Sequence, residues 1–296
     1  MAAADQSRRN PMPEVSNIQR LLPRFDRSVS LLCWAYNEED SIREYLERAR
    51  QLMESCVEDY EIVLIDDGST DRTYAIAEAF REEVPRLKIF RNETNLNVGI
   101  SSQRAIQRAS KEFLFWQTID WSYDISNLRS FLEHLKDCDI VQGVRRTPDV
   151  REGISPNSPA SLFGLFDVKR LTRRSDTAPK AIVSLINYLL IRLLFQVPLS
   201  DFQNVTFYPT QWIQSIRYES KSSFANPEGL IKSYWSGKAI KEVTINFIPR
   251  AKGKAKGTRM KAIRSSVKDI FRLWWRWIVL GKRGEIKKGR IYGVSG

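Results

Sequence analysis

Cysteine and histidine are scarce in this sequence. Among 296 residues there are one histidine, His134, and three cysteines, Cys33, Cys56 and Cys138, which lack the spacing of metal ligands. Zinc sites and disulfide frameworks are both built from clustered residues of these types. The scarcity therefore argues against both. It fits a reducing compartment, so we expect the protein in the cytoplasm.

Long apolar runs are also missing. The first residues, Met1–Pro13, are polar and predict no secretory signal. No window reaches about 18 uninterrupted apolar residues, the usual length of a membrane span. The nearest candidate, Ala181–Leu199, is interrupted by polar residues and a proline: Ser184, Asn187, Arg192, Gln196 and Pro198. Any attachment to a membrane is therefore expected to be peripheral or through a membrane-protein partner.

A third absence is a glycine-rich phosphate loop. Neither the G-x-x-x-x-G-K pattern nor the G-x-G-x-x-G pattern occurs. A nucleotide would therefore have to be held by other contacts. Apolar residues make up 42% of the chain, which is enough for a globular core.

Positive charge is concentrated at the C-terminal end. The net charge is +12, but residues 250–296 hold 15 Lys and Arg against 2 Asp and Glu, while the other residues hold 32 against 33. A basic tail of this kind favours an anionic partner: nucleic acid, a phosphorylated small molecule or an acidic membrane surface.

Apolar segments of strand length alternate with helical periodicity over the first half of the chain. This alternation predicts an α/β fold with a parallel sheet and right-handed crossovers. The expected strands are Ser28–Ala35, Tyr60–Ile65, Leu87–Phe90, Phe113–Ile119 and Asp139–Gln142. The expected helices cover about 42–53, Thr73–Glu83, Asn97–Ser110 and Ile125–Lys136.

Three of these strands end in polar, acidic turns. They are Tyr36-Asn37-Glu38, Asp66-Asp67-Gly68-Ser69 and the stretch from Asp120 to Asp124. Ligands bind beyond the carboxyl ends of strands in open α/β sheets, although each turn alone also suits helix capping. Three acidic turns on one edge would repel unless a cation or hydrogen-bond donors lay among them. Without His or Cys nearby, the suited metal is Mg²⁺ or Mn²⁺, which commonly partners the phosphates of a nucleotide.

These turns resemble the motifs of the family 2 glycosyltransferases of GT-A fold, and most of all the polyprenyl-phosphate, dolichyl-phosphate mannose synthase type. Residues 35–38 are similar to P-x-Y-N-E, with Ala for Pro, and residues 66–71 match D-D-G-S-x-D. Residues 95–99 lie where the family has N-x-G before a helix, and the resemblance covers roughly residues 28–257. It implies a nucleotide site formed by Ala35, Tyr36, Glu38, Asp66, Asp67, Gly68 and Ser69.

The resemblance also places Asp120-Trp121-Ser122 at the metal-binding D-x-D motif of the family. Ser122 stands where a second carboxylate is usual, and a hydroxyl is a weaker metal ligand. Asp124, or the diphosphate itself, would then supply the missing oxygens. The implied metal-binding residues are Asp120, Ser122 and Asp124, with Asp120 also counted as catalytic.

Three further segments are similar to that branch. The apolar helix expected at Lys180–Val197 resembles helices that lie along the membrane, within about 160–197, although a core helix fits as well. Residues 201–208 are similar to D-x-T-x-G-F-R but lack its Gly and Arg. Glu228 lies where the family has an acidic residue near the acceptor, although it could equally cap the helix that follows.

A basic loop follows the strand expected at Glu242–Pro249. The strand is similar to E-V-P-I-x-F, and residues 250–256 match R-x-x-G-x-S-K with Ala for Ser. By this resemblance Arg250 and Lys256 would hold phosphate oxygens. The alternative is a solvated basic linker.

The segment Thr258–Leu280 is amphipathic. Arg264, Lys268, Arg272 and Arg276 form a basic stripe beside an apolar face, and Trp274, Trp275 and Trp277 cluster at one end. Basic residues beside tryptophans are typical of a helix in a membrane interface. Packing on the domain's own core and binding to nucleic acid are the alternatives, and we do not expect nucleic acid to be the partner.

The sequence thus predicts a flexible arm (1–27), a GT-A domain with a mostly parallel, Rossmann-like sheet flanked by helices (28–249), and a basic, amphipathic membrane-associating tail (250–296). The expected activity is inverting, metal-assisted hexosyl transfer from a nucleotide diphosphate sugar to a polyprenyl phosphate at an anionic membrane surface. Alternatives are transfer to a glycan or soluble hydroxyl, with Asp124 or Glu228 as base, and a non-catalytic nucleotide- or membrane-binding protein. A homo-oligomer is left open.

Overall fold

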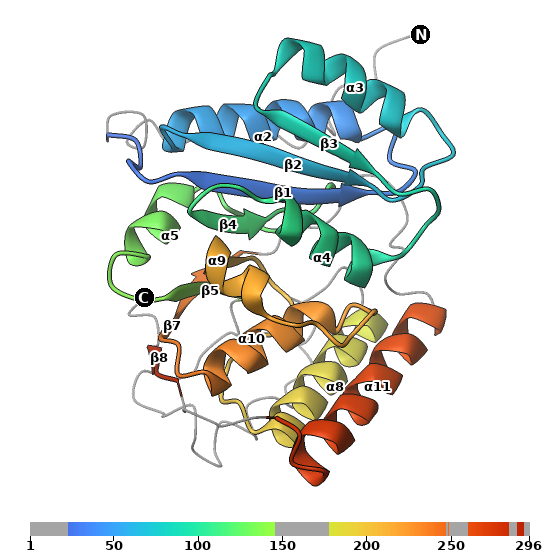
Figure 1. The fold of residues 1–296 in the computed structure, drawn as a ribbon, viewed down its shortest axis with the longest axis vertical. Helices are drawn as coiled ribbons and strands as arrows, with labels where there is room; N and C mark the ends of the chain where they lie inside the picture. Colours follow the sequence, from blue (N-terminus) through green and yellow to red (C-terminus); the bar gives the residue numbers. More distant parts are fainter. Residues whose placement is uncertain (1–22, 146–177, 247, 249–259, 284–288, 293–296) are drawn as a thin grey trace, which may run out of the picture.

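The computed structural model describes residues 23–145, 178–246, 248, 260–283 and 289–292. Over these residues the chain forms an eight-stranded sheet with the order β3-β2-β1-β4-β6-β5-β7-β8 (Figure 1). Only β6 runs antiparallel to its neighbours, β4 and β5. The strands are β1 (Val29–Ala35), β2 (Tyr60–Asp66), β3 (Leu87–Arg91), β4 (Phe113–Trp116), β5 (Ile140–Arg145), β6 (Thr206–Pro209), β7 (Ile240–Ile245) and β8 (Ile291–Tyr292). The predicted α/β fold with a mostly parallel sheet is confirmed.

Helices cover both faces of the sheet. They are α2 (Ile42–Cys56), α3 (Thr73–Glu83), α4 (Val98–Arg108), α5 (Leu128–His134), α8 (Ala178–Phe195), α9 (Thr210–Ser215), α10 (Ala225–Trp235) and α11 (Met260–Trp274), which continues as the π-helical turn η3 (Trp275–Val279). Alternate residues of β1 point to opposite faces: Leu31 and Cys33 join one core and Leu32 the other. Both faces of the strand are therefore buried, as its continuous apolar sequence requires.

The two cores have different helices. The first contains side chains of α2, α3 and α5, such as Leu46, Phe80 and Phe131. The second contains side chains of α4, α8, α9, α10 and α11, and it is rich in aromatic rings around Phe195 and Trp277. The C-terminal helix therefore packs on the second core.

Several element ends differ from the sequence expectation. Strand β4 stops at Trp116 because Gln117 begins the turn: its side-chain amide donates to the carbonyl oxygen of Tyr123 at 2.7 Å, and its side-chain oxygen accepts from the Thr118 amide at 3.0 Å. Helix α5 is shorter than expected at both ends. Strands β6 and β8 were not expected, whereas α3 has the predicted bounds.

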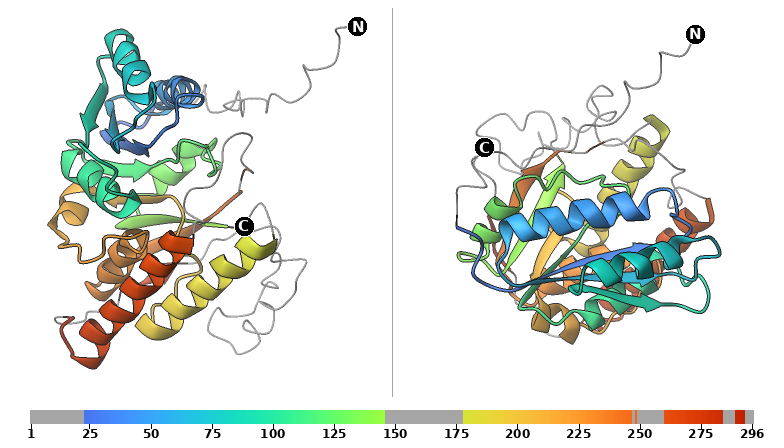
Figure 2. Two further views of the ribbon diagram at one scale, coloured as in Figure 1. Left: turned by 90° about the vertical axis from the view of Figure 1, so that its right-hand side faces the viewer. Right: turned by 90° about the horizontal axis from the view of Figure 1, so that it is seen from above.

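Helices α8 and α11 contact each other and run side by side at one end of the molecule (Figures 1 and 2). In α11 and its π turn, Ile270, Leu273 and Trp277 are fully buried. This is the packing on the domain's own core that the tail's amphipathic pattern left open. Among the helices of the described residues, none is both long enough and apolar enough to cross a membrane.

Candidate active site

The first two acidic turns lie side by side and are bonded to each other. In the parallel pairing of β1 with β2, Ala35 is opposite Asp66, and the Ala35 carbonyl accepts from the Asp67 amide at 2.8 Å. The Asn37 amide donates to Ser69 Oγ at 3.0 Å, and Asn37 Oδ1 accepts from the Thr70 amide at 2.9 Å. Asn37 has a φ of 52°, a left-handed conformation that asparagine tolerates. The structure therefore brings the two predicted nucleotide motifs together.

Glu38 and Tyr36 lie in the same turn, half-buried. The Glu38 amide donates to Thr73 Oγ1 at 2.7 Å, and the Glu38 carbonyl accepts from the amides of Ser41 and Ile42 at 2.9 Å, where α2 begins. The backbone of Glu38 thus joins the start of α2 to the start of α3.

Asp66 is fully buried at the end of β2. Its Oδ2 accepts from the Ser69 amide at 3.3 Å and forms an ion pair with Arg91 Nε at 3.1 Å, while Oδ1 has no hydrogen-bond partner among the residues that the structure describes. A buried acceptor without a donor costs free energy. An N–H group of a ligand could satisfy it.

Asp67 is occupied by protein donors. Its Oδ1 accepts from Asn92 Nδ2 at 2.7 Å and from the Leu96 amide at 2.8 Å. These bonds attach the connection between β3 and α4 to the acidic turn. Next to it, Gly68 has a φ of +71°, and a Cβ there would lie 2.5 Å from the carbonyl carbon of Thr94, so the position requires glycine. Asp67 therefore fixes the 92–96 connection beside the acidic turn, and its role in a nucleoside pocket stays a prediction.

Asp120 is half-buried beyond the end of β4. Its Oδ1 accepts from the Ser122 amide at 3.2 Å. Trp121 has a φ of 52°, and its ring is buried edge-on against Tyr45 at 5.5 Å, with the Arg48 guanidinium 4.5 Å from its centroid. This anchored tryptophan holds the turn and places Asp120 at the same sheet edge as Asp66.

The other two predicted metal ligands have structural contacts. Ser122 is buried, and its carbonyl accepts from the Ile248 amide at 2.9 Å. Asp124 Oδ1 accepts from the amide and hydroxyl of Ser126, at 3.2 and 2.7 Å, and Oδ2 accepts from Asn246 Nδ2 at 3.3 Å. These contacts lie in the turn before α5, whose N-cap is Asn127 without a side-chain cap hydrogen bond, so Asp124 does not cap that helix. Its role as a metal ligand stays a prediction.

Within the described residues, no group of three or more His, Cys, Asp or Glu side chains could hold a metal ion. A closed protein cage is therefore not formed there. Mg²⁺ commonly keeps several waters and binds through one or two carboxylates together with substrate phosphates. A single carboxylate at Asp120, completed by a diphosphate, fits that kind of site.

Glu228 lies elsewhere, fully buried in the first turn of α10. Its Oε1 accepts from the Glu219 amide at 2.8 Å and forms an ion pair with Lys232 Nζ at 2.6 Å, and Oε2 accepts from the Ser220 amide at 2.8 Å. Burial raises its pKa above the usual value, although Lys232 opposes the shift. These bonds join α10 to the preceding loop rather than to the acidic turns. Arg250 and Lys256 lie outside the described residues.

An ion pair that sequence reasoning missed lies at the carboxyl end of β5. The Arg145 guanidinium donates to both carboxylate oxygens of Asp201, at 2.7 and 2.9 Å. Tyr123 Oη, from the Asp120 turn, donates to the Gln203 carbonyl two residues on, at 3.2 Å. The signal was Asp201, the first residue of the D-x-T-x-G-F-R-like segment. The 201–205 connection therefore borders the same edge.

A family model for glycosyl transferase family 2 matches residues 30–188, more than half of the chain. The chain belongs to glycosyl transferase family 2. This glycosyltransferase is 25% identical over 269 residues to a dolichol-phosphate mannosyltransferase of Pyrococcus furiosus, covering 90% of this chain and 69% of that protein. It is 24% identical over 259 residues to glycosyltransferase AglD of Haloferax volcanii, covering 85% of this chain. The chain spans only 38% of AglD.

Solved structures place the glycosyltransferase in the GT-A fold. Glucosyl-3-phosphoglycerate synthase of Mycobacterium tuberculosis, in complex with Mn²⁺, uridine diphosphate and phosphoglyceric acid, aligns with a TM-score of 0.56 at 14% identity over 88% of this chain and 80% of that chain. Staphylococcus aureus TarS 1–349 with UDP-GlcNAc aligns with a TM-score of 0.55 at 18% identity, over 85% of this chain and 66% of that chain. At these identities the likeness concerns the fold.

Proposed function

We propose that this glycosyltransferase transfers a sugar from a nucleoside diphosphate sugar to a polyprenyl phosphate, with inversion. The observation that supports a phosphate acceptor is the hydrogen bonding of the two carboxylates that were candidates for a general base. Both oxygens of Asp124 and both oxygens of Glu228 accept hydrogen bonds from protein donors. A hydroxyl acceptor must lose a proton to a base. A phosphate monoester has a second pKa of about 6 and is already largely dianionic at neutral pH, so it needs none.

In this reaction an oxygen of the acceptor phosphate attacks the anomeric carbon of the donor sugar. The bond from that carbon to the diphosphate breaks on the opposite face, and the nucleoside diphosphate leaves with the electron pair. No proton has to be transferred. The protein's task is to align the two reactants and to offset the charge that develops on the diphosphate.

The donor half of the proposal uses the acidic edge. Asp66 Oδ1 would accept an N–H group of the base, and Asp67 would keep the 92–96 connection against the nucleoside. Asp120 would hold Mg²⁺ or Mn²⁺, which supplies positive charge for the leaving diphosphate. Arg250 and Lys256 would add cationic charge there. The likeness to the dolichol-phosphate mannosyltransferase of Pyrococcus furiosus, which covers 90% of this chain, supports a lipid phosphate acceptor.

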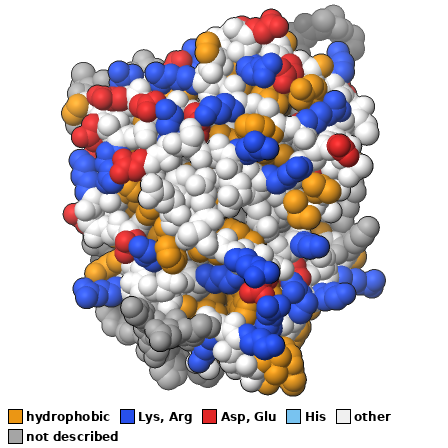
Figure 3. Space-filling view, viewed as in Figure 1, with side chains coloured by type: hydrophobic (Ala, Val, Ile, Leu, Met, Phe, Trp, Pro, Cys, Tyr) orange, Lys and Arg blue, Asp and Glu red, His pale blue; other side chains and the backbone are white. Residues whose placement is uncertain are grey.

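We also propose that the outer face of α8 and α11 lies against an anionic membrane. Exposed apolar residues cover both helices and the following turn: Val183, Ile186, Leu193, Phe271, Trp275, Val279 and Leu280. Exposed cations border them: Arg264, Lys268, Lys282 and Arg283. In Figure 3, Lys and Arg side chains gather beside apolar ones at the lower right, over these helices. This combination suits interfacial binding, which would bring the site to a lipid acceptor.

The test is transfer from a panel of radiolabelled nucleotide sugars, with Mn²⁺, to a polyprenyl phosphate and to the matched polyprenol. The two acceptors differ only in the phosphate. We expect labelled lipid with the phosphate alone, and no product with Asp120→Asn. Product with polyprenol or a glycan hydroxyl, and none with the phosphate, would replace this proposal with the hydroxyl-acceptor alternative.

A further inference from the structure

The C-terminal helix is bonded to the loop between α9 and α10 through one buried carboxylate. Asp269 of α11 is 9% exposed. Its Oδ2 accepts from the Ser220 hydroxyl at 3.1 Å and from the amides of Lys221 and Ser222 at 3.2 Å. Its Oδ1 accepts from Arg272 Nη2 at 2.8 Å, and the same nitrogen donates to the Glu219 carbonyl at 2.8 Å. One side chain of α11 thus holds three consecutive residues, which we call the 220–222 loop.

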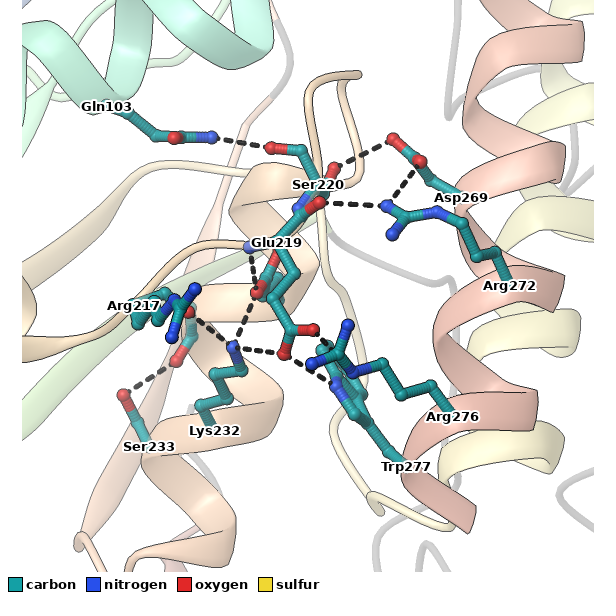
Figure 4. Close-up of polar contacts among 12 residues, drawn as sticks. Gln103, Arg217, Glu219, Ser220, Lys232, Ser233, Asp269, Arg272, Arg276 and Trp277 are labelled. Carbon is teal, nitrogen blue, oxygen red and sulfur yellow. Dashed lines mark hydrogen bonds and ion pairs between the residues drawn. The ribbon is translucent and has the colours of Figure 1, made fainter. Parts of the chain in front are cut away.

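The side chain of Glu219, just before the 220–222 loop, bonds in turn to residues that follow Asp269 on the C-terminal helix and its π turn, as Figure 4 shows. Its Oε1 accepts from Trp277 Nε1 at 2.8 Å, and its Oε2 forms an ion pair with Arg276 Nε at 3.0 Å. The Trp277 ring is 1% exposed and packs edge-on against Phe195 of α8 at 5.5 Å. Two of the four cations in the predicted basic stripe, Arg272 and Arg276, are therefore bonded to the domain, although both side chains are also exposed to solvent.

The opposite side of the 220–222 loop lies against α4. Gln103 Nε2 of α4 donates to the Ser220 carbonyl at 2.7 Å (Figure 4). A Cβ added to Gly99 would clash with the backbone carbonyl oxygens of Lys221 and Ser222. The loop backbone therefore packs directly on the first turn of α4, at a distance that only glycine permits.

The first turn of α4 is bonded to the 92–96 connection, which is itself bonded to Asp67 at the acidic edge. The Leu96 amide donates to Asp67 Oδ1, and Asn92 Nδ2 donates both to that oxygen and to Ser101 Oγ of α4, at 3.0 Å. A displacement of this turn would therefore move the 92–96 connection relative to Asp67. The contacts run without a gap from Asp269 through the 220–222 loop and α4 to the acidic edge.

We propose that Asp269 and Gln103 are positioning residues of the donor site, through which the C-terminal helix holds the 220–222 loop against α4 and so sets the pocket wall beside Asp67. The helix then has two faces with separate tasks: an inner one for the donor site and an outer one for the membrane. The ligand named here, a nucleoside diphosphate sugar, rests on the proposed function. The chain of contacts from Asp269 to Asp67 does not depend on the proposed function.

The Asp269 carboxylate keeps its charge, and with it these hydrogen bonds, at neutral pH. Burial alone would raise the pKa of Asp269, but the hydrogen bonds from Arg272 and from the 220–222 loop outweigh it and lower the pKa below its usual value. The carboxylate is therefore charged under physiological conditions, and its contribution is lost only as the pH falls through the folded pKa.

Hydrogen exchange on the unliganded, full-length protein tests the connection without any substrate. In Asp269→Ala we expect amides of residues 92–104 to exchange about tenfold faster, together with those of 219–222, and amides of α2 to keep their rate. Ser265→Ala is the matched control, an exposed position on the same helix, and should exchange as the wild type does. Faster exchange at 219–222 with no change at 92–104 would overturn the proposal.

Donor kinetics separate positioning from loss of folded protein. Asp269→Ala should raise the donor KM about tenfold with kcat within about twofold, and Asp269→Asn, which keeps an acceptor oxygen, should recover part of the loss. Gln103→Ala leaves α11 untouched and should raise the KM several-fold, which keeps the proposal testable if Asp269→Ala does not fold. Unchanged KM in Gln103→Ala would contradict it. If no nucleotide sugar is turned over, the proposed function fails while the exchange result stands.

Discussion

Two fully buried carboxylates in this glycosyltransferase have opposite surroundings. Asp66, at the end of β2, has one oxygen that no donor of the described part of the chain reaches. Glu228, in α10, has both oxygens engaged by two amides and a lysine. Since buried polar groups are normally satisfied, the open oxygen of Asp66 supports the proposal that a ligand binds at the sheet edge, and the saturated carboxylate of Glu228 is explained by its contacts within the fold. The comparison separates a sheet edge, where we propose that a substrate binds, from α10, where a buried carboxylate joins the helix to the preceding loop.

The largest effect should come from Glu228. In Glu228→Ala, Lys232 and two amides lose their buried acceptor, so the free energy of unfolding should fall by about 3–5 kcal/mol. Urea denaturation measures it, with Glu228→Gln, which keeps one acceptor oxygen, as a milder control. A loss below about 1 kcal/mol would mean that the saturated carboxylate does not support the fold.

Asp120 should show the reverse pattern. Asp120→Asn removes charge from the edge where the diphosphate leaves, and turnover at saturating donor should fall about 10²–10³-fold. The thermal midpoint should move by no more than about 2 °C. Asp124→Asn is the control. Because Asp124 bonds to Ser126 and Asn246, this change should lower the thermal midpoint more than Asp120→Asn does and reduce turnover less. Wild-type turnover in Asp120→Asn would contradict the proposed contrast between Asp120 at the sheet edge and Glu228 in α10.

Glu242, a buried carboxyl in β7, should make the stability of the fold depend on pH. Burial raises its pKa to about 7, although hydrogen bonds from the amide and hydroxyl of Ser200 oppose the shift. A carboxyl with a raised folded pKa binds more protons folded than unfolded, so it stabilises at low pH and that stability is lost as the pH rises from 4.5 through about 7. The change should be about 3 kcal/mol. Chemical denaturation of Glu242→Gln should lack this pH dependence, and an identical slope would remove the assignment.

The two halves of the basic stripe should behave differently on vesicles. All four cations are exposed, but Arg272 and Arg276 also bond to Asp269 and Glu219. Arg264→Gln with Lys268→Gln should weaken binding to anionic vesicles by about 2 kcal/mol, about 1 kcal/mol for each charge, with stability unchanged. Arg272→Gln with Arg276→Gln should instead lower stability. Vesicle sedimentation at two salt concentrations decides it, since salt-insensitive binding would exclude the electrostatic part.

The smallest effect is expected at Asp67. Because its oxygen holds the Leu96 amide and Asn92, Asp67→Ala should loosen the pocket wall and raise the donor KM about tenfold, or about 1.4 kcal/mol. Asn92→Ala, which keeps the Leu96 bond, should have a smaller effect in the same assay. A donor KM equal to that of the wild type in both variants would move the pocket away from this wall.

The sheet edge could be predicted because its signals are local. An apolar run that ends in Asp66-Asp67-Gly68-Ser69 carries both the strand and the turn in a few consecutive residues, and the parallel order of strands brings such turns together. The periodicity of the sequence could not show which donor bonds to each carboxylate. Asp67 was expected to shape the nucleoside pocket, which stays a prediction, and the structure shows that its oxygen bonds to the Leu96 amide and to Asn92.

The contacts around α10 and α11 were less predictable because they join distant segments. Glu219 and Asp269 are fifty residues apart, and neither carries a local pattern that names the other. The amphipathic tail predicted a basic stripe and an apolar face, but not that Trp277 would be buried or that two stripe cations would bond to the domain. Strand β6 is only four residues long and antiparallel, so alternation in the sequence did not reveal it.

The most direct test of this division is calorimetric titration of nucleoside diphosphates, UDP and GDP among them, with and without Mn²⁺, into the wild type, Asp120→Asn and Glu228→Gln. The gain in affinity that Mn²⁺ brings is the quantity to compare. The account predicts that Asp120→Asn abolishes this gain and keeps the wild-type unfolding temperature, while Glu228→Gln keeps the gain and lowers the unfolding temperature. A gain retained in Asp120→Asn and lost in Glu228→Gln would contradict it.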